Sequence, residues 1–171
     1  MKLKKGKKQG GILQDSLAYL KETRNYIYLA IAIFFISALI GFLFPERFTF
    51  FNDALKNLVD RTKDLGTIDL IIFIFKNNAS NAIFSILLGV LLGIIPFFNI
   101  LLNGLLLGYV FALVSDLGGL GIAWRLVPHG IFELPAIFIS IGLGMRLGMF
   151  VFAKNKKKEF LYRFFESLKV F

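Results

Sequence analysis

The chain has 171 residues, of which 57% are hydrophobic and 18% are charged, and its formal net charge is +9. A soluble domain carries roughly 25% charged residues and spaces its apolar residues periodically. Here the apolar residues form continuous runs close to the ~20 residues that cross a bilayer. The composition therefore excludes an ordinary soluble domain and predicts an all-α polytopic membrane protein with amphipathic interfacial helices. The chain contains no cysteine, which excludes disulfides and thiolate metal sites.

Lysines cluster at both ends of the chain, in a basic N-terminal segment over residues 1–25 and a basic amphipathic tail over residues 153–171. Beside membrane spans such clusters indicate the cytoplasmic face and its anionic lipids, so we do not expect nucleic acid as a partner. We interpret the lysines of the tail as lipid or partner contacts; they are Lys154, Lys156, Lys157 and Lys158.

The transmembrane domain is predicted over residues 26–152, and its first span covers about residues 26–44. Pro45 ends this span because proline cannot continue a helix. Residues 49–65 follow, with apolar side chains at helical spacing on one face and balanced charges on the other. This pattern predicts an external amphipathic helix that lies along the outer membrane surface or on the transmembrane bundle.

The remaining spans begin after a polar cluster at residues 76–81, which follows an apolar run too short to cross the bilayer. The asparagines of this cluster predict N-caps for a second span over about residues 79–95, and the alternative is a span that includes part of the preceding apolar run. Pro96 separates that span from a third over about residues 98–115, and a fourth covers about residues 130–152. Four spans place both termini on one side, which the lysines make cytoplasmic, in the cell membrane.

Each of the last three predicted spans carries a G-x-x-x-G motif, which lets helix backbones approach closely in lipid. The motifs predict that these spans form the compact core and that the first span packs at its edge. A seam between copies of a homo-oligomer is the alternative interpretation. The helix-packing residues are Gly89, Gly93, Gly104, Gly108, Gly144 and Gly148.

His129 and Glu133 are the strongest polar pair at membrane depth, because a spacing of four residues places both on one face of a helix. Pro135 frees a backbone carbonyl one turn earlier. The pair is interpreted as a structural device, as a proton relay or substrate contact, or as part of a metal site. A metal would require further ligands, and we expect neither a metal nor a cofactor.

Asn103 lies within the third span and is costly there unless it bonds across helices. Together with Asn77 and Asn81 it completes the predicted polar cluster around His129 and Glu133. Arg146 lies two-thirds along the fourth span, and we expect it to extend to the cytoplasmic interface as a lipid or partner contact. A partner inside the bundle is the alternative.

The segment Pro128-His129-Gly130-Ile131-Phe132-Glu133-Leu134-Pro135 resembles the stage II sporulation protein M family. The resemblance extends from about Tyr28 to Phe152 and includes Asn103-Gly104-x-x-x-Gly108, the Gly89 and Gly93 pair, and the Asn77–Asn81 cluster. Relatives commonly continue into a final apolar span, whereas this chain ends in an amphipathic segment. It is therefore expected to be either a short member or one whose last span has been cut away.

The resemblance implies a non-catalytic membrane scaffold that assembles or anchors partner proteins. In endospore-forming bacteria the family member is the membrane subunit of an engulfment machine and holds two peptidoglycan-degrading partners. The alternative function is a small transporter or channel subunit with a polar pathway near Asn103, His129 and Glu133. A metal-dependent intramembrane enzyme is the third hypothesis, and we do not expect an enzyme.

Overall fold

A computed structural model describes residues 11–118 and 127–170, with side chains described for residues 11, 13–115 and 134–170. The described part is helical and contains no strand. Its elements are α1 (Ile12–Leu43), η1 (Pro45–Phe48), α2 (Phe51–Thr62), α3 (Thr67–Leu87), η2 (Leu88–Val90), α4 (Ile94–Gly118), α6 (Val127–Gly148), η4 (Met149–Phe152) and α7 (Lys156–Val170).

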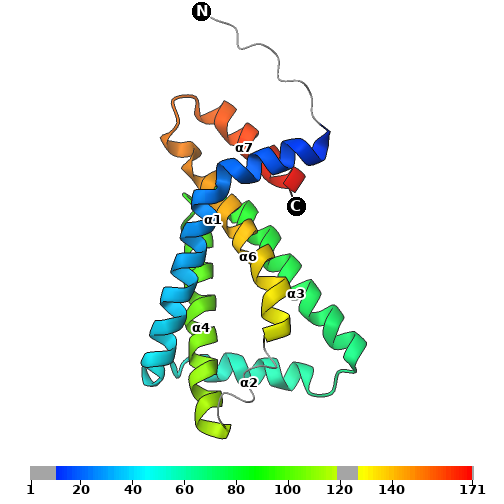
Figure 1. Cartoon of the computed structure of the whole chain (residues 1–171), viewed down its shortest axis with the longest axis vertical. Helices are drawn as coiled ribbons and strands as arrows, with labels where there is room; N and C mark the ends of the chain where they lie inside the picture. Colours follow the sequence, from blue (N-terminus) through cyan, green and yellow to red (C-terminus); the bar gives the residue numbers. More distant parts are fainter. Residues whose placement is uncertain (1–10, 119–126, 171) are drawn as a thin grey trace, which may run out of the picture.

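Within the described residues, four helical segments are long and apolar enough to cross a membrane, which confirms the predicted class. They are Leu13–Leu43, Thr67–Val90, Ile94–Ser115 and Leu134–Phe152. The amphipathic helices α2 and α7 lie at opposite ends of this bundle, while the N-terminal part of α1 and the C-terminal part of α7 lie at the same end (Figure 1).

Helix α1 is a single helix of 32 residues and joins the predicted basic N-terminal segment to the first span. No glycine or proline lies between Gly11 and Gly41 to interrupt it. At about 1.5 Å per residue, the helix is ~48 Å long and exceeds the ~30 Å hydrocarbon core of a bilayer. The helix is therefore long enough for its N-terminal part to extend beyond the membrane, and its other end is at Leu43, just before Pro45, as predicted.

Helix α3 differs from the prediction, because it begins at Thr67 and continues through the polar cluster to Leu87. The predicted start near residue 79 is wrong, and the alternative of a span that includes the preceding apolar run is correct. The asparagines of residues 77–81 lie inside the helix instead of capping it. Helix α2 ends at Thr62 and α3 begins at Thr67, directly after Gly66. The apolar run after Gly66 therefore forms the first half of the span. Helix formation satisfies the backbone of this run, which a loop in lipid would leave unpaired.

The turn between α3 and α4 also differs from the prediction. The chain reverses over η2 and the following residues, where Leu92 and Gly93 have φ of 59° and 69°. Pro96 is not the break; it lies in the first turn of α4, where its missing N–H would have no helical partner. Gly93 tolerates the left-handed conformation at little cost, which explains its place at the turn.

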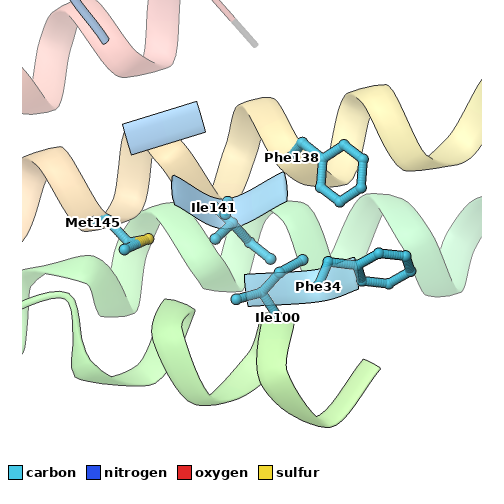
Figure 2. Close-up of a cluster of buried hydrophobic side chains, with 6 residues drawn as sticks. Phe34, Ile100, Phe138, Ile141 and Met145 are labelled. Atoms are coloured by element: carbon cyan, nitrogen blue, oxygen red, sulfur yellow. The ribbon is translucent and has the colours of Figure 1, made fainter. Parts of the chain in front are cut away.

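The core lies between α1, α4 and α6, since α1 packs most extensively on α4 and next on α6. Figure 2 shows side chains from these helices meeting in one cluster. Helix α3 packs mainly on α6 and touches α4 little. The prediction that the first span packs at the edge of a core formed by the last three spans is therefore wrong. The buried cluster consists of Ala30, Phe34, Ile100, Phe138, Ile141 and Met145.

Candidate functional site

Three asparagines form a hydrogen-bonded chain between α3 and α4, which we call the asparagine cluster: Asn81, Asn99 and Asn103. The Nδ2 of Asn99 donates to the Oδ1 of Asn81 over 2.6 Å. The Nδ2 of Asn103 donates to the Oδ1 and to the backbone oxygen of Asn99, over 2.8 and 2.9 Å. All three side chains are half-buried. Each of these three amides thus has a protein partner, which polar groups at membrane depth ordinarily need.

The fold positions this cluster through two simple relations. Asn99 and Asn103 lie one turn apart on α4 and therefore share a face. The reversal between α3 and α4 then brings Asn81 alongside Asn99. The predicted cross-helix bond from an asparagine of the third span is present, but Asn99 makes it and Asn103 does not. Asn103 bonds to Asn99, which in turn bonds to Asn81. The i, i+4 spacing of Asn99 and Asn103 was the signal for it.

The predicted partners His129 and Glu133 lie on the first turns of α6, and their side chains fall outside the described residues. Their proximity to Asn103 therefore stays a prediction. Asn77 lies one turn before Asn81 on α3 but is exposed and is not part of the asparagine cluster. Pro135 lies inside α6, as predicted.

A second polar centre surrounds Arg146 at the other end of α6, and we call it the Arg146 cluster. The guanidinium donates to the Oε2 of Glu22 over 2.7 Å and to the Oγ1 of Thr23 over 2.8 Å. It also donates to the backbone oxygen of Tyr19 over 3.2 Å and lies 4.1 Å from the centre of that ring. Only 12% of the arginine side chain is exposed. A cation so enclosed requires these oxygen acceptors to offset its lost solvation.

Helix α7 closes the Arg146 cluster from the opposite side. Arg163 donates through Nη1 to the backbone oxygen of Arg146 over 2.8 Å and pairs with Glu159 at 3.1 Å. The hydroxyl of Tyr19 donates to the backbone oxygen of Arg163 over 3.2 Å. Burial raises the pKa of Tyr162 on the same helix, and the nearby Glu22 carboxylate raises it further. The cluster thus ties α1, α6 and α7 together at one end of the bundle.

Arg146 therefore has partners inside the protein, as in the alternative interpretation, and its extension to the cytoplasmic interface stays a prediction. Sequence reasoning missed its acceptors on α1. A usable signal was present, because Tyr19, Glu22 and Thr23 recur at the i, i+3 and i+4 positions of one helical face. That face lies within the basic N-terminal segment, which was predicted separately from the transmembrane domain that contains Arg146.

The tail lysines are exposed and lie just before α7 and in its first turn. Positive charges at a helix N-terminus oppose the helix dipole and weaken the helix slightly. Their position is therefore not explained by the stability of α7. The set consists of Lys154, Lys156, Lys157 and Lys158.

The glycines of the three motifs are all buried against other helices or turns of the same chain. A Cβ atom on Gly104 or Gly108 would overlap backbone atoms of α1. A Cβ atom on Gly144 or Gly148 would overlap the end of α3 or the turn that follows it. These motifs therefore face the interior of the chain, and the interpretation of the motifs as an oligomer seam is wrong for these residues.

Comparisons with known proteins identify the family of this chain. Residues 30–171 match the family described as Stage II sporulation protein M, so the match includes α7, whereas the resemblance had been expected to end near Phe152. An uncharacterized protein of the archaeon Methanocaldococcus jannaschii is 30% identical over 165 residues, which cover 93% of this chain and 72% of that protein. No solved structure matches the chain. Since the family match covers most of its length, this chain belongs to the Stage II sporulation protein M family.

Proposed function

We propose that the protein is a non-catalytic membrane scaffold that assembles or anchors partner proteins. The observation that carries the proposal is the state of the buried polar groups. Among the described residues, no buried side-chain nitrogen or oxygen lacks a hydrogen-bond partner. The asparagine cluster and the Arg146 cluster hold helices together, and groups committed to such bonds suit a rigid frame better than a reaction.

The two ends of the bundle supply surfaces for partners. Phe51 packs with Leu105 and Tyr109 of α4, and the Tyr109 hydroxyl donates to the Oδ1 of Asn52 over 2.6 Å, which fixes the start of α2. The rest of α2 is mostly exposed, including its charged residues and apolar side chains such as Leu58. Such a helix, held at one end, suits docking of an external protein.

The exposed tail lysines support a location at the cytoplasmic face of the cell membrane, with both termini on that side. Anionic lipid headgroups would balance the charges that disfavour the first turn of α7. The close approach of glycine backbones supports a packing role for the G-x-x-x-G motifs. A homo-oligomer would then use surfaces other than these motifs.

The alternative function, a small transporter or channel subunit, draws on the asparagine cluster, since amides at membrane depth can line a polar pathway. The scaffold is favoured because these amides bond to one another. A metal-dependent enzyme would need ligands around His129 and Glu133, which lie outside the described side chains. Metal analysis of the purified protein tests that third hypothesis.

The scaffold hypothesis is tested by crosslinking in native membranes, purification of the tagged protein, and reconstitution of the pure protein into vesicles. We expect specific partner proteins in the crosslinked complexes and no ion or solute flux from the vesicles. The His129→Ala variant should lower stability or partner recovery. Flux that Glu133→Gln abolishes while the fold survives would overturn the scaffold in favour of a transporter.

A further inference from the structure

Helix α3 carries an ionisable residue in the middle of a membrane-spanning segment. Lys76 is the tenth residue of the span Thr67–Val90, so it lies about 14 Å from one end of the helix and about 21 Å from the other. The side chain is exposed on the surface of the protein. Lysine at this depth in lipid is rare, and it ordinarily has a partner.

Two further polar side chains adjoin Lys76 on the same surface. Ser80 lies four residues after Lys76 and three after Asn77, so the three side chains form one continuous patch, which we call the α3 polar patch. All three are exposed. Exposed Ile72 lies one turn before the patch and exposed Phe84 one turn after it. The result is a polar centre with an apolar border, and polar side chains on the surface of a membrane helix can bond to a neighbouring helix.

Lipid alone does not satisfy this patch. The lysine can extend its ammonium toward the nearer end of the span, but Asn77 and Ser80 are too short to do so. Asp69 lies on the same side of α3, seven residues earlier and about 10 Å along the axis, too far for an ion pair with Lys76. Its carboxylate instead lies near Gly66 at the start of the helix.

A second copy of the chain does not suit the patch either. Two copies in one membrane that pair through α3 about a twofold axis would bring their Lys76 side chains together at the same depth. Two like charges close together in a medium of low dielectric constant repel strongly. The complementary surface is one that carries a negative charge at mid-membrane depth.

We propose that the α3 polar patch is a docking site for a membrane-spanning helix of a partner protein that carries a carboxylate near its centre. The carboxylate pairs with Lys76, and Asn77 and Ser80 bond to polar atoms of the same helix. The apolar border packs against its neighbouring side chains. This inference rests on the scaffold function proposed above and specifies the chemistry of one partner.

The probe is a synthetic helix of about 20 leucine and alanine residues with one glutamate at its centre, long enough to cross a bilayer. The natural chain has no cysteine, so an Ile68→Cys variant carries a single fluorophore at the start of α3. Energy transfer to a labelled peptide in phosphatidylcholine vesicles measures association. Interhelical polar contacts of this kind predict roughly threefold to thirtyfold tighter binding of the glutamate peptide than of a peptide with leucine at the centre.

Lys76→Met should remove this preference, because methionine keeps the length of the side chain without its charge. Lys56→Met on α2 is the matched control and should retain the preference. Equal binding of the glutamate and leucine peptides to the natural sequence would overturn the proposal. So would a preference that survives in Lys76→Met, or efficient disulfide dimers of a Ser80→Cys variant in the membrane, which would show a second copy at the patch.

Failure of this inference is distinguishable from failure of the scaffold. If crosslinked native complexes are recovered equally with the natural chain and with Lys76→Met, the scaffold stands and the patch is not its docking site. If the vesicles conduct a solute and no complex forms, the scaffold itself is overturned.

Discussion

At the residue scale, Arg146 shows how one side chain can join three helices. Its guanidinium binds oxygens of α1, and its own backbone oxygen accepts a bond from Arg163 of α7. The ion pair with Glu22 has one exposed member, because 47% of the glutamate side chain is exposed against 12% of the arginine. Solvent screening therefore weakens the ion pair, and the hydrogen bonds to Thr23 and to the Tyr19 backbone carry more of the stabilisation.

Replacing Arg146 with alanine should lower the free energy of unfolding by about 2 kcal/mol, because the oxygens of Thr23 and Tyr19 lose a charged donor. Arg146→Lys should recover only part of this loss, since an ammonium cannot reproduce the planar fork. Unfolding of the purified protein in mixed micelles, monitored by circular dichroism, measures both. Lys157→Ala, at an exposed position, is the control and should stay within ~0.5 kcal/mol. Equal effects of Arg146→Ala and this control would contradict the assignment.

The asparagine cluster makes a prediction about coupling between two residues. A double-mutant cycle with Asn81→Ala and Asn99→Ala should give a coupling energy of about 0.6 kcal/mol, the average for polar contacts between membrane helices. The same micelle unfolding assay measures it. Asn77→Ala paired with Asn99→Ala supplies the matched control, because Asn77 lies one turn from Asn81 and does not join the cluster. Coupling of similar size in the control would mean that the measured term is not the Asn81–Asn99 bond.

At the element scale, the sequence predicted the helices where apolar runs were long, and failed where tertiary contacts decide. Four spans and both amphipathic helices are present. The start of α3 was not predicted because asparagine can either cap a helix or lie within it. In the structure the helix continues through the asparagines, and Asn81 bonds to Asn99 on α4. The central position of α1 was missed because its contacts lie with helices distant in sequence. Apolar composition alone does not show which helices touch.

The contact between α1 and α4 depends on small residues, since a Cβ atom on Gly108 would overlap the backbone oxygen of Ala38. Gly108→Ala should therefore force the two helices apart and destabilise the protein by about 1–3 kcal/mol. Thermal unfolding in detergent measures the loss. Gly66→Ala is the control, because its nearest neighbour would lie 3.8 Å away and its φ of −66° suits alanine. A Gly108→Ala variant as stable as this control would show that α1 and α4 are not in close backbone contact.

At the scale of the whole molecule, the bundle presents two different ends. One end joins α1, α6 and α7 through the Arg146 cluster, and the other carries α2 against α4. The Lys-rich tail belongs to the first end and the charge-balanced helix to the second (Figure 1). A protein that crosses the membrane four times must place these ends on opposite sides, because α2 follows the first span and α7 follows the fourth.

The positive-inside rule assigns the tail end to the cytoplasm, and this assignment can be tested because the natural chain has no cysteine. Lys56→Cys on α2 and Lys157→Cys on α7 each place one thiol at an exposed position. A membrane-impermeant maleimide added to intact cells should label the Lys56→Cys variant and leave the Lys157→Cys variant unlabelled until the cells are permeabilised. Labelling of both variants in intact cells would contradict the four-span topology, and the reverse pattern would invert its orientation. In the predicted pattern, α2 lies outside the cell, where we propose that it contacts partners, and the lysines beside α7 lie on the side of the anionic inner leaflet, so that one bundle links the two surfaces.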